Sequence, residues 1–396
     1  MANILGININ SLERREISAR LLEALDGNKR CFIVTPNPEI ILLAHKDEEL
    51  FYILNRADLS LADGFGLKIA AFLYQEKITR LTGADFAVDL LNLAHQKKRR
   101  VAVVNWRGGL SGKEEISVAL SQKYPGLEFL VLDVSRSASL AGWPAWVIAG
   151  LKEFSSEIVF CTFGSPYQEK SVYHSLPQLP EVKVALSCGG AFDFITGKLT
   201  RAPLFFRKIG LEWLWRLYQQ PARFKRIVNA VLVFSAKVMA ARFFYKHRYR
   251  KNVACLLFKQ EQSGKKILIV ERSDNPGYWQ LPQGGLDGES IELAGARELR
   301  EETGVTSISK KGFFKDVYTY NFPSFNSQQK HVAGYKGQRQ SLFIAEFTGP
   351  ETEIKINFWD HSNWQWVREE DLISAVHEIR RPGIKIFLDK LKSLNL

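Results

Sequence analysis

The chain has 396 residues, of which 46% are hydrophobic and 24% charged, a composition typical of a globular protein with two or three domains. Its four cysteines lie far apart and form no Cys-x-x-Cys pair, which gives no zinc motif and excludes a disulfide-dense secreted scaffold. Charges appear too early in the first residues for a signal peptide, so we expect a cytoplasmic protein.

The first 200 residues alternate short apolar runs with amphipathic stretches. Strands are predicted at 31–35, 100–106, 127–133, 157–164 and 182–190, and helical spacing at 38–57 and 84–99. This alternation predicts a Rossmann-like α/β domain over 1–204, with a mostly parallel sheet and helices on both faces. Ligands of such sheets bind beyond the carboxyl ends of the strands, so the loops after the strands are the expected site.

A strongly basic segment follows. Residues 198–251 hold fourteen Lys or Arg and one acidic residue, Glu212, a net charge of +13, whereas the rest of the chain carries −1. Eleven aromatic residues are interleaved with these charges. Such a segment faces anionic lipid, nucleic acid or phosphate. The aromatic residues favour a membrane interface over the alternative of a helix with solvated basic faces.

Apolar residues continue at helical spacing through this segment, on both sides of Pro221. The run from Ile227 to Tyr245 is apolar but contains Lys237 and Arg242, which makes it borderline for a transmembrane helix. We expect residues 205–250 to be an appendage and linker whose helix lies on a membrane surface. A helix packed on a neighbouring domain is the alternative.

The pattern changes at Asn252. Four apolar runs, "VACLLF", "KILIVERS", "RQSLFIAEF" and "SNWQWV", predict strands of a mixed sheet. A helix is predicted from about Ile291 to Glu302, and the chain closes with the amphipathic stretch "IKIFLDKLKSL". Residues 251–396 therefore form a second domain with an α/β/α arrangement.

The predicted helix carries Glu298, Glu301 and Glu302 on one face, where like charges repel each other. A glycine-rich loop precedes it and Gly304 is placed to cap its end. A loop folded against clustered carboxylates makes an oxygen-rich site for Mg²⁺ or Mn²⁺, and the cation offsets the repulsion. The alternative is a solvated acidic face.

The stretch "GGLDGESIELAGARELREETGV" resembles the Nudix box of hydrolases that act on nucleoside-diphosphate-linked compounds. The flanking "YWQLPQGG" and "YKGQRQSLFIAEF" resemble the branch that acts on dinucleoside polyphosphates and 5′-triphosphorylated RNA. The resemblance implies water attack on a pyrophosphate phosphorus with Mg²⁺ or Mn²⁺. It implies that Glu298, Glu301 and Glu302 hold the metal, that Glu298 and Glu301 act in catalysis, and that Glu289 and Arg297 form a structural pair.

Two departures from that pattern are visible. The loop from Gly284 to Glu289 is one residue shorter than in the usual box, and Asn357 lies near a position that is often acidic in that branch. Both departures bear on the choice of substrate. No general base downstream of the box is identified.

Four polar loops follow predicted strands of the first domain: "TPNPE", "LADGFG", "FGSPYQEK" and "CGGAFDFITGKLTRAP". Each alone could be a capped turn. Together they would meet at one edge of the sheet and supply a carboxylate, amides and backbone N–H groups to one cleft.

The stretches "TPNPEI", "ADLSLADGFGL", "RLTGADF", "YPGL", "FGSPYQEK", "GGAFDFITGKLTRAP" and "GLEWLWRLYQQPARFKR" resemble the WecG/TagA/CpsF glycosyltransferases, glycosyltransferase family 26, over about residues 1–230. The resemblance implies inverting transfer of an N-acetylmannosamine-type sugar from a UDP-sugar to a polyprenyl-diphosphate-linked acceptor, with no cofactor required. It also implies that the appendage brings the enzyme to an anionic membrane surface, peripherally at the inner face of the cell membrane.

Inverting transfer needs a base for the acceptor hydroxyl, and Asp63 is the candidate. Sugar positioning is assigned to Thr35, Asn37, Gln168 and Glu169, and phosphate binding to Arg80, Arg201, Arg216 and Arg223. Asn105 and Trp106 replace a glycine-rich stretch usual in the family, and "LDVSRSASLAG" lacks its Gly-Tyr pattern. The donor sugar is therefore open.

The main hypothesis is a fusion of two enzymes, a glycosyltransferase and a Nudix pyrophosphohydrolase acting on a nucleotide substrate. A second hypothesis makes the Nudix domain a non-catalytic nucleotide sensor that regulates the transferase. A third makes hydrolysis of RNA or dinucleoside polyphosphates the main activity, with the basic segment engaging RNA. A homo-oligomer is left open.

Overall fold

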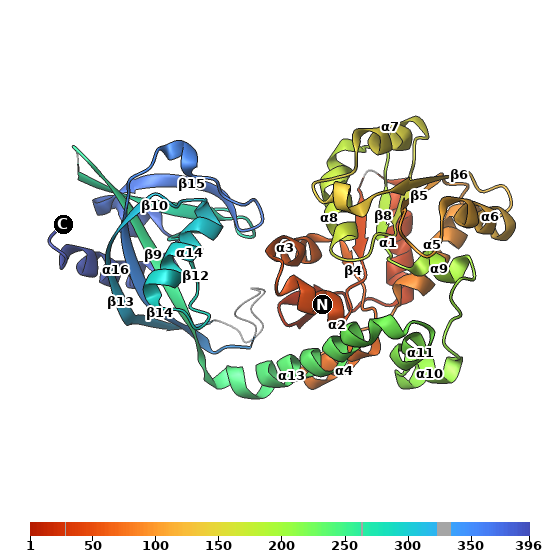
Figure 1. The fold of residues 1–396 in the computed structure, drawn as a ribbon, viewed down its shortest axis with the longest axis horizontal. Coiled ribbons are helices and arrows are strands. Elements are labelled where there is room, and N and C mark those ends of the chain that lie inside the picture. Colours follow the sequence, from red (N-terminus) through yellow and green to blue (C-terminus); the bar gives the residue numbers. More distant parts are fainter. Residues whose placement is uncertain (28, 263, 323–333) are drawn as a thin grey trace. The chain divides into compact units, whose positions relative to one another are not determined.

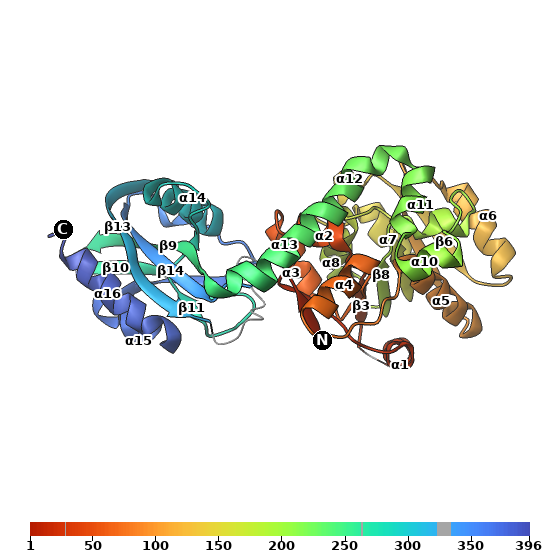
Figure 2. The same cartoon turned by 90° about the horizontal axis from the view of Figure 1, so that it is seen from below.

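The computed structural model describes residues 1–27, 29–262, 264–322 and 334–396. They form two compact units, Met1–Arg242 and Phe243–Leu396 (Figures 1 and 2). Each unit has its own sheet and its own buried core. Most of the predicted appendage, residues 205–250, falls within the first unit.

Within the described residues, the first unit is built on a six-stranded sheet in the order β4-β3-β8-β7-β5-β6. Every pairing in this sheet is parallel, which confirms the predicted topology. Its strands are β3 (Cys31–Val34), β4 (Leu59–Ser60), β5 (Val101–Trp106), β6 (Phe129–Val134), β7 (Ile158–Cys161) and β8 (Val184–Ser187). A separate antiparallel hairpin joins β1 (Ala2–Ile4) to β2 (Ile7–Ile9).

Helices cover both faces of this sheet because its strands are apolar on both sides (Figure 1). One face is packed by α1 (Arg14–Asp26), α5 (Gly83–Gln96), α6 (Lys113–Lys123) and α9 (Ala191–Ile195), whose core includes Leu21, Phe86, Leu120 and Phe192. The other face is covered by α2 (Pro38–Ala44), α3 (Glu48–Arg56), α7 (Ala145–Glu153) and α8 (Tyr167–Ser175). Short 3-10 turns lie at η1 (Arg136–Ser139) and η2 (Leu176–Gln178).

The predicted helical stretch 38–57 is two helices, α2 and α3. Asn37 caps α2, and its side-chain oxygen accepts the Ile40 N–H. Asp47 caps α3 in the same way through the Leu50 N–H. A second capping side chain within one apolar pattern starts a new helix because it satisfies free N–H groups there.

The end of the first unit is helical. It contains α10 (Leu204–Ile209), α11 (Glu212–Gln219), the turn η3 (Pro221–Arg223), α12 (Phe224–Val228) and α13 (Phe234–Met239), with π-helical turns at η4 (Asn229–Val233) and η5 (Ala240–Phe244). Helix α4 (Phe65–Leu73) comes earlier in the chain, after β4. Phe234 and Val238 are buried, and α13 contacts α2 and α4. The side of the helix that carries Phe234 and Val238 is therefore packed against neighbouring helices, which was the alternative considered from the sequence.

Among the described residues one helix, Phe224–His247, is long and apolar enough to cross a membrane, with a mean hydropathy of 1.7. This finding rests on length and composition, and 17% of its most apolar stretch is buried.

The second unit is built on a mixed sheet, which confirms the prediction. Within the described residues its order is β11-β10-β9-β14-β13, with β12 paired to β9 and β15 to β10. The β9–β14 pairing is parallel and the others are antiparallel. The strands are β9 (Tyr249–Glu261), β10 (Gly264–Arg272), β11 (Trp279–Gln280), β12 (Gln283–Gly285), β13 (Ile308–Asn321), β14 (Gly337–Phe347) and β15 (His361–Arg368).

Separate cores lie on the two faces of this sheet. One includes Ala294 and Leu299 of α14 (Ile291–Thr303), and the other includes Phe387 and Leu391 of α16 (Arg381–Lys392). The remaining short helices are α15 (Leu372–Ala375), η6 (Tyr245–His247), η7 (Glu351–Glu353), η8 (Glu369–Asp371) and η9 (Glu378–Arg380). The predicted α/β/α arrangement is therefore present, and β13 is a strand that the sequence analysis did not predict.

Candidate active sites

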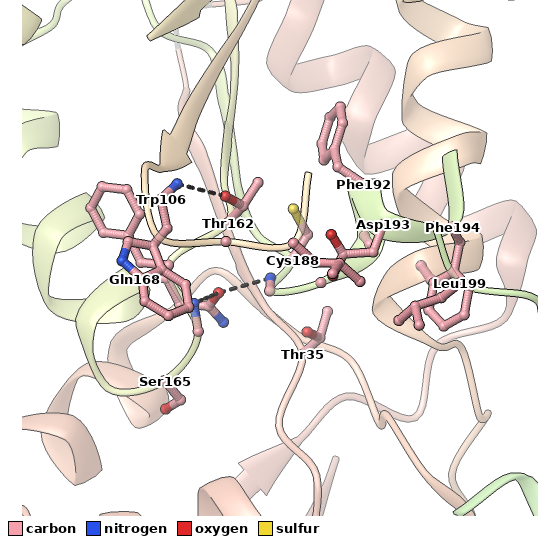
Figure 3. Close-up of a pocket in the computed structure, with 18 of the residues that line it drawn as sticks. Thr35, Trp106, Thr162, Ser165, Gln168, Cys188, Phe192, Asp193, Phe194 and Leu199 are labelled. Atoms are coloured by element: carbon pink, nitrogen blue, oxygen red, sulfur yellow. Dashed lines mark hydrogen bonds between the residues drawn. The ribbon is translucent and has the colours of Figure 1, made fainter. Parts of the chain in front are cut away.

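A cleft of about 740 Å³ lies at the carboxyl ends of the parallel strands in the first unit. The loops after β3, β4, β7 and β8 all contribute to its lining, as predicted from the four polar stretches. Figure 3 shows Thr35, Thr162, Gln168 and Cys188 from these loops around the same space. One further wall comes from the basic segment, which contributes Arg216, Gln219, Gln220, Pro221, Ala222 and Arg226.

Asp63 lines this cleft just after β4. The backbone N–H of Asp63 donates to the Pro36 carbonyl at 2.9 Å, and Gly64 follows at a φ of 114°, which turns the chain sharply into α4. Burial raises the pKa of the Asp63 carboxyl, while the nearby Arg216 and Arg80 oppose the rise and Glu212 adds to it. A carboxylate with a raised pKa is a better proton acceptor, as a general base requires.

Thr35 and Asn37 also line the cleft. The Thr35 hydroxyl donates to the Ser187 carbonyl at 3.2 Å, which ties the end of β3 to the end of β8. The Asn37 side-chain oxygen is engaged in capping α2. The backbone of Gly83 packs closely against the Thr35 side chain, since a Cβ on Gly83 would lie 2.9 Å from the Thr35 hydroxyl oxygen.

Gln168 lines the cleft and joins two of its loops. Its side-chain oxygen accepts N–H groups from Gly164 at 3.1 Å and Gly189 at 2.8 Å (Figure 3). Its amide nitrogen donates to Glu169 at 2.8 Å. Glu169 is fully buried, and burial raises the pKa of its carboxyl. These contacts hold the loops after β7 and β8 together.

Three of the four predicted phosphate-binding arginines gather around Glu212. Its carboxylate lies 2.6 Å from Arg80, 3.2 Å from Arg201 and 3.6 Å from Arg216. Arg201 also pairs with Asp85. Of these three arginines, Arg216 lines the cleft and has the longest contact with Glu212.

The fourth arginine, Arg223, ends the turn η3, and its side chain lies outside the described part of the structure.

Arg136 is a cleft residue that was not predicted from the sequence. Its guanidinium lies 3.8 Å from the Trp106 ring centroid and 4.9 Å from that of Tyr167, and all three residues line the cleft. Cation–π contacts of this kind hold an arginine in place without a carboxylate. The sequence did contain one indication of the role of Arg136, namely the departure from the family pattern at Trp106. An aromatic residue at the end of a strand can pack against a cation.

In the second unit, the glycine-rich loop and α14 pack as predicted. Arg297 donates to Glu289 at 2.8 Å and to the Gly285 carbonyl at 2.8 Å, so the structural pair forms although the loop is shortened. Gly284 touches the helix so closely that a Cβ would lie 1.9 Å from the Glu298 carboxylate. Gly304 caps α14 in the left-handed conformation at a φ of 73°, as predicted.

The three clustered glutamates differ in their surroundings. Glu298 and Glu301 both contact Arg297, at 2.7 Å and 2.9 Å, and Glu302 accepts the Gln283 N–H at 3.0 Å. Burial and the neighbouring Glu302 raise the pKa of Glu298 to about 8. The carboxylates of Glu298 and Glu302 therefore repel each other in the folded protein, as expected from the sequence.

As packed, the described residues include no group of three or more His, Cys, Asp or Glu side chains gathered closely enough to hold a metal ion. The carboxylates are turned toward Arg297 and Gln283 instead. Their chemistry nevertheless fits a divalent cation, since buried carboxylates with too little positive charge around them are the oxygen ligands that Mg²⁺ and Mn²⁺ take.

Two residues beyond the box reach this site. The Asn357 side chain donates to the Glu301 carbonyl at 2.8 Å, at the end of α14. His361, which opens β15, lies 3.1 Å from the Glu302 carboxylate. The sequence analysis noted Asn357 but not His361, whose only signal was its place four residues after Asn357.

The parallel sheet with its polar cleft, followed by a mixed sheet bearing a Nudix-type carboxylate helix, defines a bifunctional enzyme with a transferase unit and a hydrolase unit. Comparison with known proteins agrees with this class. The chain belongs to the glycosyl transferase WecG/TagA/CpsF family, whose profile matches residues 2–248, and a NUDIX domain follows at residues 248–389.

The relatives of the two parts are enzymes. Over 240 residues the chain is 31% identical to an N-acetylglucosaminyldiphosphoundecaprenol N-acetyl-beta-D-mannosaminyltransferase of Bacillus spizizenii, covering 58% of this chain and 87% of the relative. Over 140 residues it is 37% identical to an RNA pyrophosphohydrolase of Caulobacter vibrioides, covering 34% of this chain and 80% of the relative. A C. elegans Ap4A hydrolase structure covers 36% of this chain and 98% of its own, with 20% identity and a TM-score of 0.29.

Proposed function

We propose that the first unit transfers an N-acetylmannosamine-type sugar, with inversion, from a UDP-sugar to a polyprenyl-diphosphate-linked acceptor. The observation that carries this proposal is the placement of Asp63, with its raised pKa, in the same cleft as Arg216. The name of the Bacillus spizizenii relative states an N-acetylmannosaminyl transfer and a diphosphoundecaprenol-linked acceptor, which supports this sugar and this class of acceptor.

In this mechanism Asp63 accepts the proton of the acceptor hydroxyl, which then attacks the anomeric carbon of the donor as the UDP leaves. Arg216 and Arg136, which both line the cleft, offer positive charge to the diphosphate. Thr35 and Asn37 position the sugars. Gln168 and Glu169 act behind them by holding the loops together. Arg80 and Arg201 hold Glu212 and so fix the wall that carries Arg216.

The basic segment would place this cleft at a membrane surface, where a polyprenyl acceptor resides. The helices of this segment expose large apolar side chains beside its positive charges: Leu204, Phe205, Phe224 and Leu232 are each at least 60% exposed. Basic residues near an anionic leaflet contribute about 1 kcal/mol each, and exposed aromatic residues favour the interface. Arg226 pairs with Glu39 at 2.5 Å, which joins this helix to the cleft.

For the second unit we propose hydrolysis of a nucleoside-diphosphate-linked substrate, with RNA or dinucleoside polyphosphates as the substrate class. Glu298, Glu301 and Glu302 would hold a divalent cation, which when bound supplies charge neutralisation at the phosphates. Arg297 and Glu289 keep the helix and loop in register. The intact pair favours a working hydrolase over a nucleotide sensor that does not turn over.

The proposal is tested by product analysis of the full chain. A panel of UDP-sugars is incubated with and without a short-chain prenyl-diphosphate-linked acceptor, and released UDP and lipid-linked sugar are measured. We expect UDP release only with the acceptor present. Equal release without it would refute the transferase assignment.

The hydrolase is assayed separately on a 5′-triphosphorylated RNA and on a dinucleoside tetraphosphate, each with Mg²⁺ or Mn²⁺. We expect Glu301→Gln to remove turnover, because one carboxylate of the site is lost. Nucleotide binding without turnover by the unaltered chain would favour the sensor hypothesis.

A further inference from the structure

His361 stands at the start of β15, at the end of the loop from Asn357. The His361 backbone N–H donates to the Asn357 carbonyl at 2.9 Å, which closes this loop, and the Asn357 side chain donates to the Glu301 carbonyl at 2.8 Å, which joins the loop to α14. The position of the His361 ring is therefore set by the end of α14, the helix that carries the three glutamates.

The His361 side chain is 3% exposed, and its Nε2 atom lies 3.1 Å from Glu302 Oε2. The direction of this contact does not make a hydrogen bond, and neither ring nitrogen has a hydrogen-bond partner among the described residues. A buried polar nitrogen without a hydrogen-bond partner is destabilising. The His361 imidazole lies beside a cluster of carboxylates and lacks a hydrogen-bond partner in the part of the chain that the structure describes. This arrangement suits a ligand that the imidazole and the carboxylates bind together.

The negative charge of the carboxylate cluster indicates that this ligand is positively charged. Glu298 and Glu302 are both largely buried and their like charges interact, while Arg297 is shared among several carboxylates. A cation would relieve this repulsion, whereas an anion would add to it. Neutral imidazole and carboxylate oxygens together are ligands for first-row divalent metals.

We propose that Nε2 of His361 is a ligand of the divalent cation in the Nudix site, beside the carboxylate of Glu302. The proposal rests on the hydrolase function proposed for the second unit. His361 would add a nitrogen ligand to the three glutamate ligands that the Nudix box supplies.

A nitrogen ligand changes which metals the site prefers. Mg²⁺ favours oxygen ligands, whereas affinity for sites with imidazole rises from Mn²⁺ to Co²⁺. We therefore expect the full chain to bind Co²⁺ more tightly relative to Mg²⁺ than its His361→Asp variant, in which an oxygen replaces the nitrogen.

The direct test is pulsed electron paramagnetic resonance of the full chain loaded with one equivalent of Mn²⁺, without substrate. We expect the spin-echo modulation to show a ¹⁴N coupling from a bound imidazole, and His361→Gln to abolish it. His377→Gln is the matched control, because this histidine of the same unit has its ring stacked on Tyr278 at 4.0 Å. It should leave the coupling unchanged.

Bound Mn²⁺ without a ¹⁴N coupling, or a coupling that survives His361→Gln, would overturn the proposal and leave the hydrolase function standing. A chain that binds no Mn²⁺ at all would overturn both. Metal affinities by calorimetry give a second measurement that does not depend on the EPR signal. The ratio of the Mg²⁺ to the Co²⁺ dissociation constant should fall about 10-fold in His361→Asp, and an unchanged ratio would contradict the nitrogen ligand.

Discussion

Asp63 is held at the cleft by its backbone N–H bond to the Pro36 carbonyl, and its carboxyl feels the charges of Arg216, Arg80 and Glu212. Replacement by Asn keeps the shape and removes the proton acceptor. We expect Asp63→Asn to lower the transfer rate by about 10²–10⁴-fold, measured as UDP release with acceptor. Asp89→Asn on the surface of α5 is the control, since Asp89 pairs only with the exposed Arg14 among its described contacts. A full rate in Asp63→Asn would remove Asp63 from the mechanism.

The same assignment predicts the direction of the pH dependence. A base works when deprotonated, so kcat/KM falls as pH drops through the pKa of Asp63. Burial raises this pKa above its usual value, so the acidic limb should lie at a higher pH than for an ordinary aspartate. The pH profile of kcat/KM checks this, and a flat profile down to the usual range of aspartate would contradict it.

Glu212 compensates three arginine side chains from a position that is 8% exposed. Removing a buried partner leaves charges uncompensated, which costs about 3–5 kcal/mol. We expect Glu212→Gln to destabilise the first unit by about 3 kcal/mol, seen as a lower unfolding midpoint in denaturant. Glu114→Gln, in the first turn of α6, should leave the midpoint unchanged. An unaltered midpoint in Glu212→Gln would show that the arginines find other partners.

Elements with a strong apolar period could be predicted from the sequence, and those whose limits depend on side chains could not. The five strands 31–35 to 182–190 and the helix α14 follow directly from their apolar runs. The break between α2 and α3 depends on the caps Asn37 and Asp47, which lie inside one apolar period. β13 contains mostly half-buried or exposed residues, so its sequence lacks the apolar signal of the others.

Candidate site residues show the same division. Asp63, Gln168 and the Glu289–Arg297 pair were identified because motif spacing fixes them. The grouping of Arg80, Arg201 and Arg216 on Glu212 could not be predicted, since it joins α11 to residues up to 132 positions away. Arg136 and His361 escaped for the same reason: their partners come from other strands and loops.

The helix that begins at Phe224 exposes apolar side chains on one side while burying Phe234 and Val238 on the other. Leu232 is 63% exposed on this helix, so a charge there should not disturb the core. We expect Leu232→Glu to weaken flotation with vesicles containing anionic lipid and to leave the unfolding midpoint unchanged. Val118→Glu, at 54% exposure on α6, is the matched control and should float normally.

If Leu232→Glu floats as well as the unaltered chain, the exposed side of this helix does not meet the membrane. An RNA gel shift on the same variants separates the two anionic partners, because an apolar side chain contributes little to a contact made through phosphate charge. RNA binding that Leu232→Glu retains, together with normal flotation of that variant, would favour the RNA hypothesis for the basic segment.

At the scale of the whole molecule, each proposed chemistry is contained in one unit with its own core. The transferase residues lie within Met1–Arg242 and the carboxylate helix within Phe243–Leu396. Two sites influence each other only if a ligand of one changes an equilibrium that the other senses. Without such a shared equilibrium, the two activities should respond to substitution separately.

We therefore expect Asp63→Asn to remove transfer and spare hydrolysis, and Glu301→Gln to do the reverse, with both activities measured in the same preparation. A chelator of divalent cations should stop hydrolysis and leave transfer within about twofold, because the transferase cleft is proposed to work through Asp63 and arginines alone. The informative exception is a change in transfer when nucleotide is added to Glu301→Gln, which no longer consumes it. A change of 5-fold or more would correspond to a coupling free energy of about 1 kcal/mol, and it would make the second unit a regulator of the first as well as a hydrolase.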